Sequence, residues 1–254
     1  MKNLRQFMKS EIEDYKVLLR NAPPLVMILF VISVIAMNLL ANKELVNIGF
    51  LALDCGFLLS WLSFLCMDML TKRFGAKPAI KLSLFAIAMN LCMCVIFYIV
   101  SLVPGNWGEF YTVGDQVAND VLNRTIGGSW YILFGSMLAF AVASVTNALM
   151  NVTIGKLLKF DNFVSYALRS YISTALGQFV DNFIFALVVS KVLFGWTMLQ
   201  CVTCSLVGAI AELVSEVVFS PFGFSVCRRW ESEKVGDSYL NYCKERETAN
   251  EQKH

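Results

Sequence analysis

Long apolar runs separated by short polar segments dominate the pattern along this chain. A membrane-spanning helix needs about 20 apolar residues. Six runs are long enough: residues 24–41, 49–70, 79–103, 129–154, 164–193 and 197–220. The connection at 104–128 is longer than the others and predicts a short amphipathic helix, with Trp107 and Tyr111 at the membrane interface.

The pattern therefore predicts an all-α integral membrane protein with six transmembrane helices. A cytoplasmic N-terminal segment (1–23) precedes the six-helix domain (24–226), and a polar cytoplasmic tail (227–254) follows it. No linker rich in Pro, Gly or Ser divides the apolar part, so we expect one domain.

Composition and charge support a membrane protein and give it an orientation. Hydrophobic residues make up 57% of the chain and charged residues 16%, whereas about a quarter of the residues in soluble domains are charged. Lys and Arg beside transmembrane helices favour the cytoplasmic side. An N-terminus in the cytoplasm places seventeen of them inside and three outside, with Arg169 left inside a predicted helix. We expect a multi-pass protein of the cell membrane with both termini in the cytoplasm.

The sequence offers little for catalysis. The only histidine is His254, so zinc-dependent proteolysis and His-based acid–base chemistry have no internal residue to use. Cys201 and Cys204 have the spacing of a redox motif, but they lie in a predicted membrane helix, where Cys packs as a small apolar residue. We expect no enzyme activity, no metal and no cofactor, and the net charge of +2 indicates no nucleic-acid partner.

Acidic residues inside the apolar runs are the strongest functional signal. They are Asp54, Asp68, Asp181, Glu212 and Glu216. A charged side chain at the centre of a membrane helix costs about 2.5–3.5 kcal/mol even on lenient scales. We therefore expect these acids to face one another, water or a ligand.

Helical periodicity places several polar residues on shared faces. The face in 164–193 carries Ser170, Ser173, Thr174, Gly177, Gln178 and Asp181; the face in 197–220 carries Cys201, Cys204, Ser205, Gly208, Glu212 and Glu216; the 129–154 helix adds Ser144, Asn147 and Asn151. Three consecutive helices thus each present a polar stripe at membrane depth.

Structural explanations compete with functional ones at several positions. Asp54 suits the start of a helix, where a carboxylate caps the backbone. Asp68 has Lys72 four residues later as a partner. Asn147 and Asn151 suit hydrogen bonds between helices. Asp181, closest to the middle of its helix, has the weakest structural explanation.

Glu212 and Glu216 lie four residues apart on one helix face, so two ionised carboxylates there would repel each other. One of them then holds a proton, or a cation sits between them. The alternative is that one acid pairs with Arg169 or a nearby Lys and joins two helices.

Three blocks of the sequence resemble the queuosine precursor transporter family, also called the vitamin uptake transporter family. Residues 59–79, LSWLSFLCMDMLTKRFGAKPA, resemble its Asp-x-x-Thr…Phe-Gly signature. RSYISTALGQFVDNFIF (169–185) resembles its Arg…Ser…Gly-Gln-x-x-Asp…Phe segment, and ELVSEVVFSPF (212–222) its Glu-then-Pro ending. The chain departs from the family at Ser144 and Asn147, where Gln and Asp are frequent, and at Asn182, where Ser or Thr is commoner.

The resemblance implies a six-helix carrier, related in architecture to the vitamin-binding subunits of energy-coupling transporters, that imports a 7-deazaguanine precursor of queuosine (preQ0, preQ1 or queuine). A carboxylate can accept both donors of a guanine-like edge, an amide can donate to the ring carbonyl, and aromatic rings can stack on the base. The expected substrate-binding residues are Asp181, Gln178, Asp68, Asn147, Phe185 and Trp61, with Arg169, Asn151 and Ser173 as further candidates and Glu212 and Glu216 as the proton-coupling pair or second acid.

Two other classes of function stay open. The chain could be a substrate-binding subunit that depends on a separate ATP-driven module, since it has no Walker A motif of its own. A membrane enzyme or scaffold is less favoured, because no Ser–His, Cys–His or metal arrangement occurs. The expected partners are a small purine-like base, the lipid bilayer and a second copy of the chain in a homo-oligomer.

Overall fold

A computed structural model describes residues 2–157 and 163–251 of the chain. Within these ranges the side chains are not described at 2–7, at most positions from 144 to 174, and at 216, 220, 247 and 249–251.

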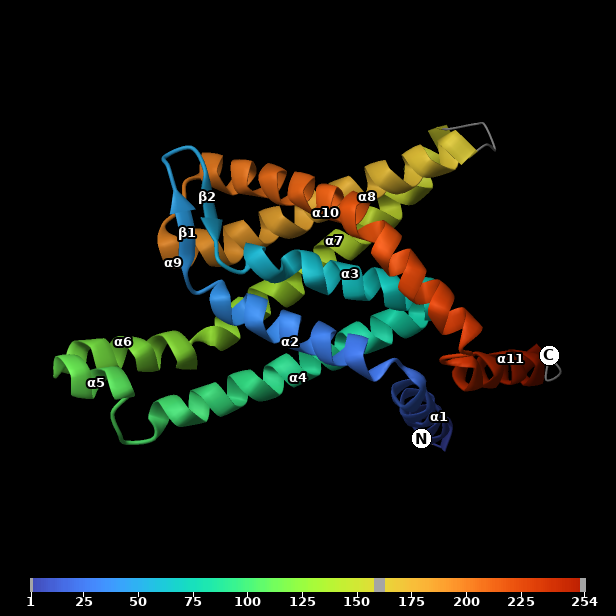
Figure 1. The fold of residues 1–254 in the computed structure, drawn as a ribbon, viewed down its shortest axis with the longest axis horizontal. Coiled ribbons are helices and arrows are strands. Elements are labelled where there is room, and N and C mark those ends of the chain that lie inside the picture. The colour runs from blue at the N-terminus through green and yellow to red at the C-terminus, as the bar shows by residue number, and fades with distance from the viewer. Residues whose placement is uncertain (1, 158–162, 252–254) are drawn as a thin grey trace.

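Helices form most of the fold, and one short hairpin lies among them (Figure 1). The elements in chain order are α1 (Lys2–Asn21), α2 (Pro24–Leu40), β1 (Glu44–Asn47), β2 (Ala52–Asp54), α3 (Phe57–Phe74), α4 (Ala76–Leu102), α5 (Gly108–Val113), α6 (Gln116–Gly127), α7 (Ser129–Leu157), α8 (Phe163–Phe185), a π-helical turn η1 (Ala186–Ser190), α9 (Lys191–Phe194), α10 (Met198–Ser232) and α11 (Asp237–Glu251).

The bundle has two distinct ends (Figure 1). The hairpin, α9 and the α5–α6 pair lie at one end, while α1, α11 and both chain termini lie at the other. Between the ends, α8 packs against α7 and α10, and α3 packs against α2, α4 and α10. Both termini thus share one side of the molecule; that this side is cytoplasmic stays a prediction from the distribution of Lys and Arg.

The predicted helix over 49–70 is wrong at its beginning. Strands β1 and β2 pair antiparallel, with Glu44 opposite Asp54 and Asn47 opposite Ala52, and Gly49 takes a positive φ of 79° in the turn. Helix α3 begins only at Phe57. A short apolar run has the same hydropathy in a strand as in a helix, so the run GFLALDCG looked like the start of a span. The fold is therefore mainly α-helical with a small sheet, not all-α.

Four helical segments of the described chain are long and apolar enough to cross a membrane: Ala76–Leu102, Gln116–Ala143, Ala175–Phe194 and Met198–Phe219. The helices Met8–Asn21 and Pro24–Leu40 meet at a bend of 107°. If this pair counts as one span, the number of candidate spans rises to five. Helix α3 is not among them, since its 18 residues include Asp68, Lys72 and Arg73. The protein is a multi-span membrane protein, and the count of six remains a prediction.

The segment after residue 226 is more ordered than the expected polar tail. Helix α10 continues to Ser232, and α11 follows after a turn in which Lys234 and Gly236 have positive φ. Trp230 and Tyr239 are buried in the main apolar cluster of the bundle. Residues 227–251 therefore pack on the helices, and their polar side chains also make ion pairs with them, such as Asp237 with Arg73.

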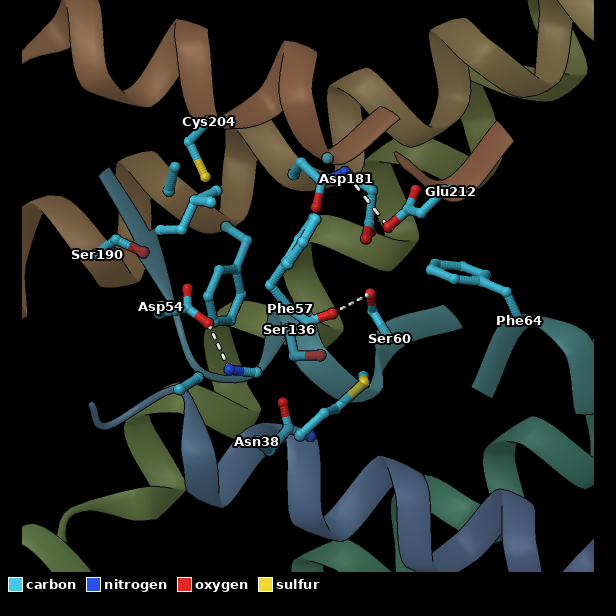
Figure 2. A pocket seen from close by; sticks show the side chains of 18 residues that line it. Asn38, Asp54, Phe57, Ser60, Phe64, Ser136, Asp181, Ser190, Cys204 and Glu212 are labelled. Atoms are coloured by element: carbon cyan, nitrogen blue, oxygen red, sulfur yellow. Dashed lines mark hydrogen bonds between the residues drawn. The ribbon is translucent and has the colours of Figure 1, made fainter. Parts of the chain in front are cut away.

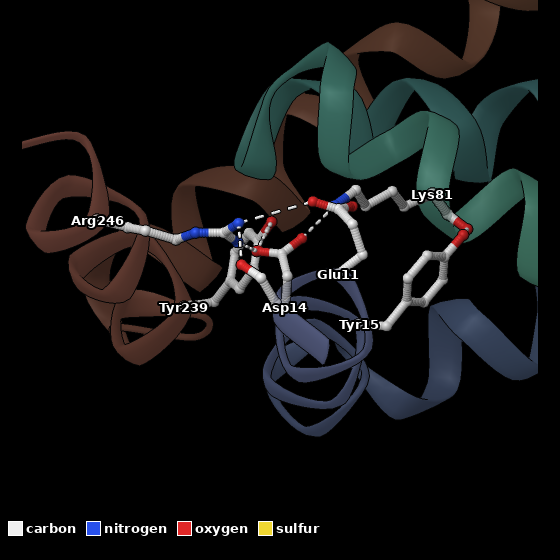
Figure 3. A network of polar contacts seen from close by, with 7 residues as sticks. Glu11, Asp14, Tyr15, Lys81, Tyr239 and Arg246 are labelled. Atoms are coloured by element: carbon white, nitrogen blue, oxygen red, sulfur yellow. Dashed lines mark hydrogen bonds and ion pairs between the residues drawn. The ribbon is translucent and has the colours of Figure 1, made fainter. Parts of the chain in front are cut away.

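A polar network fastens α1 and α11 to the beginning of α4 (Figure 3). Lys81 of α4 donates a hydrogen bond to Glu11 at 2.7 Å and pairs with the buried Asp14, both on α1. From α11, Arg246 lies 3.5 Å from Asp14, and Tyr239 donates a hydrogen bond to the same carboxylate at 3.5 Å. These charges neutralise one another, which allows a buried carboxylate at this end of the bundle.

Candidate functional site

A cavity lies inside the bundle where α2, the hairpin, α3, α7, α8, η1 and α10 meet (Figure 2). Its volume is about 90 Å³, which corresponds to roughly three water molecules at about 30 Å³ each. Its polar lining residues are Asn38, Asp54, Ser60, Ser136, Asp181, Asn182, Ser190, Cys204 and Glu212, and its aromatic ones are Phe57, Phe64 and Phe185.

Asp181 enters the cavity from α8. Its Oδ1 atom is buried and has no hydrogen-bond partner among the described residues. Phe185, one helical turn later, also lines the cavity, as expected for positions i and i+4 of a helix. A carboxylate and a flat aromatic ring are thus presented together on one face of α8.

Glu212 enters from α10 and is only 6% exposed. Its Oε1 atom accepts a weak hydrogen bond from Asn182 Nδ2 at 3.5 Å, while its Oε2 atom is buried without a partner in the described part of the chain. The approach of the two helices depends on Gly208, because a Cβ atom there would lie 2.8 Å from Asn182 Nδ2.

Asp54 reaches the cavity from the end of β2 and is 8% exposed. Its Oδ1 atom accepts a hydrogen bond from the backbone N–H of Gly56 at 2.9 Å, just before α3 begins. This contact satisfies one of the free N–H groups near the helix start. Asp54 is not the N-cap expected from the sequence, because α3 begins after Gly56 and that residue has no side-chain cap; Asp54 instead fixes the turn before the helix and contributes a carboxylate to the cavity wall.

The hairpin that carries Asp54 is pinned to the beginning of α10. Trp196 Nε1 donates to Glu44 Oε1 at 2.6 Å, and Gln200 Nε2 donates to Asn47 Oδ1 at 2.8 Å. Both donors are buried, so losing either bond would leave an unsatisfied group. The hairpin is thereby held over the cavity, and Asp54 keeps a fixed position.

Ser190 supplies a further unsatisfied group. It lies in the π-helical turn, is fully buried, and its Oγ atom has no partner among the described residues. π-helical turns occur frequently at functional sites. Asn38 of α2 and Ser136 of α7 also line the cavity, so hydrogen-bond donors surround the three acids on several sides.

Three expected site residues lie away from this cavity. Trp61 stacks on Phe219 with ring centroids 4.6 Å apart. Asp68 is exposed further along α3. Gln178 is on α8 but does not line the cavity; its Oε1 atom is buried and has no partner in the described part of the chain, while its backbone carbonyl accepts a hydrogen bond from Asn182 at 3.0 Å.

The side chains of five further candidates lie outside the described residues: Asn147, Asn151, Arg169, Ser173 and Glu216. In contrast, Asp181, Phe185 and Glu212 come together in one place. Sequence reasoning did not include Asp54, Asn38, Ser136 or Ser190 in the site. The signal for Asp54 was its charge in an apolar run, but the three others had none, because isolated Ser and Asn are common in membrane helices.

The residue types in the cavity suit the binding of a small polar molecule. Among its described lining residues there is no Lys, Arg or His. No group of three or more His, Cys, Asp or Glu in the described chain could hold a metal ion. A cavity lined by aromatic rings, carboxylates and hydrogen-bond donors is typical of a small-molecule site.

The comparison with known families agrees with a membrane carrier. A family model described as "Putative vitamin uptake transporter" matches residues 54–226, a range that begins at Asp54 and contains Asp181 and Glu212. No curated protein and no solved structure matches the chain. Since the matched range covers more than half of the chain, this protein belongs to the vitamin uptake transporter family.

Proposed function

We propose that this protein imports a 7-deazaguanine precursor of queuosine across the cell membrane and binds it in the cavity between α8, α10 and the hairpin. The family model supports transport, and the motifs around Asp68, Asp181 and Glu216 support this cargo through their resemblance to queuosine precursor transporters. In this proposal α3 also crosses the membrane, and both termini are cytoplasmic.

The observation that carries the proposal is the buried, unpartnered Oδ1 atom of Asp181. A buried polar atom without a partner is costly, so an acceptor of this kind is expected to meet a donor from a ligand. A guanine-like edge has a ring N–H beside an amino group, and a carboxylate accepts both in a bidentate pair. Asp181 is the natural acceptor, because Phe185 lies on the same face of α8 and can stack on the ring.

The remaining lining residues fit the rest of such a base. Its ring carbonyl needs a donor, which the amide of Asn38 or the hydroxyl of Ser136 or Ser190 can provide. A flat bicyclic ring system is also of the same order of size as a space for several water molecules. Phe57 and Phe64 give further apolar surface for its faces.

Transport against a gradient needs a group that changes charge between conformations. Glu212 suits this role, since its Oε2 atom is buried in the cavity wall beside a substrate held by Asp181. A proton bound to Glu212 would remove the cost of the buried charge, and its release on one side of the membrane would couple uptake to the proton gradient.

Purified protein in liposomes tests the proposal directly. We expect saturable uptake of radiolabelled preQ0 or preQ1 by this chain alone, stimulated by an inward proton gradient. Unlabelled guanine-like bases should compete, while an unrelated vitamin such as riboflavin should not. Binding without uptake would indicate instead a substrate-binding subunit that needs an ATP-driven module, and absence of both would contradict the proposal.

A further inference from the structure

The charges that line the cavity are all of one sign. Asp54, Asp181 and Glu212 come from three different elements, β2, α8 and α10, and meet in one small space (Figure 2). The other described lining residues include no Lys or Arg that could neutralise them. Placing three carboxylates in one cavity is costly unless protons or a bound cation balance their charge.

Two further observations point to a ligand that balances this charge. Glu212 is 6% exposed and its Oε2 atom has no partner among the described residues. Ser190 is 0% exposed and its Oγ atom also has none in the part of the chain that the structure describes. Buried polar atoms are nearly always satisfied in folded proteins, so both atoms are expected to meet donors or acceptors from a bound molecule.

No group of three or more His, Cys, Asp or Glu among the described residues has the arrangement of a metal site. Protons can neutralise some of the acids, but one of them has a reason to stay ionised. Burial raises the pKa of Asp54 to about 6, which is still below neutral pH, and the Gly56 N–H that donates to it at 2.9 Å favours its charged form.

We propose that the cavity selects a positively charged base over a neutral or anionic one, and that Asp54 receives the cationic group. This inference rests on the proposed function and adds the charge of its substrate. The ring edge is then held by Asp181, and a protonated primary amine on the base lies against Asp54. An ionised carboxylate has about four acceptor sites, so Asp54 can keep the Gly56 bond and accept from an ammonium group as well.

The hairpin fixes the position of Asp54, and this position affects which substrates the cavity accepts. Asp54 belongs to β2, which Trp196 and Gln200 hold against α10 through Glu44 and Asn47. The acid therefore stands at a fixed place in the wall rather than on a flexible loop. A cation is attracted to it, whereas a carboxylate on the substrate would be repelled by the ionised Asp54.

Three probes that share one ring test the inference: 7-deazaguanine carrying an aminomethyl, a nitrile or a carboxylate group at C7. Binding of each to the purified full-length protein is measured by calorimetry. We expect the aminomethyl compound to bind at least about tenfold more tightly than the nitrile, since hydrogen bonds between charged groups are about twice as strong as neutral ones. The carboxylate compound should show no measurable binding.

The variant Asp54→Asn tests the assigned residue. Asparagine keeps an oxygen for the Gly56 N–H but carries no charge, so the preference for the aminomethyl compound should fall to about threefold or less. The matched control Asp120→Asn, at an exposed acid on α6, should keep the wild-type preference. The unfolding temperature of both variants without ligand shows whether either has lost its fold.

The outcomes are distinct. Equal or tighter binding of the nitrile compound by the wild type would overturn the cation preference while leaving the proposed function intact. A preference retained in a folded Asp54→Asn protein would overturn the role of Asp54. If none of the three compounds binds, the proposed function itself is wrong, and this inference is wrong with it.

Discussion

Asn182 and Glu212 face each other across the contact between α8 and α10, with Asn182 Nδ2 3.5 Å from Glu212 Oε1. The same amide also donates to the backbone carbonyl of Gln178 at 3.0 Å. Asn182 therefore links the helix that carries Asp181 to the helix that carries Glu212. The position of one acid relative to the other depends on this amide.

Gly208→Ala should disturb that link. A Cβ atom at this position would lie 2.8 Å from Asn182 Nδ2 and 3.0 Å from its Cγ, so the amide must move away. Overpacking of this kind typically costs about 1–3 kcal/mol of stability. We expect a lower unfolding temperature in detergent and weaker substrate binding by the same protein.

The control is Gly108→Ala, where an added Cβ would meet no atom within 4 Å. Gly108 begins α5, which lies away from α8 and α10 in Figure 1, and it does not line the cavity. Its alanine variant should match the wild type in both measurements. Unchanged stability and binding in Gly208→Ala would show that α8 and α10 are less closely packed than the structure indicates.

Asp181→Asn should weaken substrate binding by at least about tenfold. The change keeps the size of the side chain but turns one acceptor oxygen into a donor, and a lost hydrogen bond to a charged group costs about 1.5–3 kcal/mol. Calorimetry with the purified variant measures the loss. A folded variant with near-normal binding would mean that Asp181 does not contact the substrate.

Glu212→Gln separates binding from coupling. Glutamine resembles the protonated acid, so the variant should still bind substrate and exchange it across a liposome membrane. It should fail to accumulate substrate when an inward proton gradient is imposed. Normal accumulation under that gradient would exclude Glu212 as the proton carrier and favour a purely structural role beside Asn182.

The apolar runs of the sequence predicted most of the helices but not the hairpin of β1 and β2. Spans near α4, α7, α8 and α10 were visible, because each is longer than a buried soluble helix requires. The strand pair around Gly49 was hidden, since its residues are as apolar as the helix that follows. The packing of residues 227–251 was also missed, because Trp230 and Tyr239 are too sparse to give a hydrophobic period.

The candidate site could be predicted only as far as single helices. Helical spacing placed Asp181 and Phe185 on one face, and both line the cavity. It could not show that Asp54 joins them from a hairpin more than 120 residues earlier, because that contact depends on tertiary packing. For the same reason Trp61 was expected to stack on the substrate ring, whereas it stacks on Phe219.

The network at the end with both termini predicts a dependence of stability on pH. The hydrogen bond and charge of Lys81 hold the pKa of Glu11 below its ordinary value of 4.5. A carboxyl with a lowered pKa in the folded state stabilises the protein above its unfolded pKa, and that contribution is lost as the pH falls through the folded pKa. We therefore expect the unfolding temperature to drop below pH 4.5 partly because α1 loosens from α4.

Glu11→Gln isolates this contribution. About a third of the Glu11 side chain is exposed, so solvent screening limits its effect to at most about 0.5–1 kcal/mol. The variant should be slightly less stable than the wild type near neutral pH, and the two unfolding curves should converge as the pH falls below 4.5. Asp120→Asn, which removes an exposed acid outside the network, should follow the wild type throughout. A constant difference between Glu11→Gln and wild type at every pH would mean that the charge of Glu11 does not stabilise its contact with Lys81, and that Asp14 and Tyr15 hold α1 against α4.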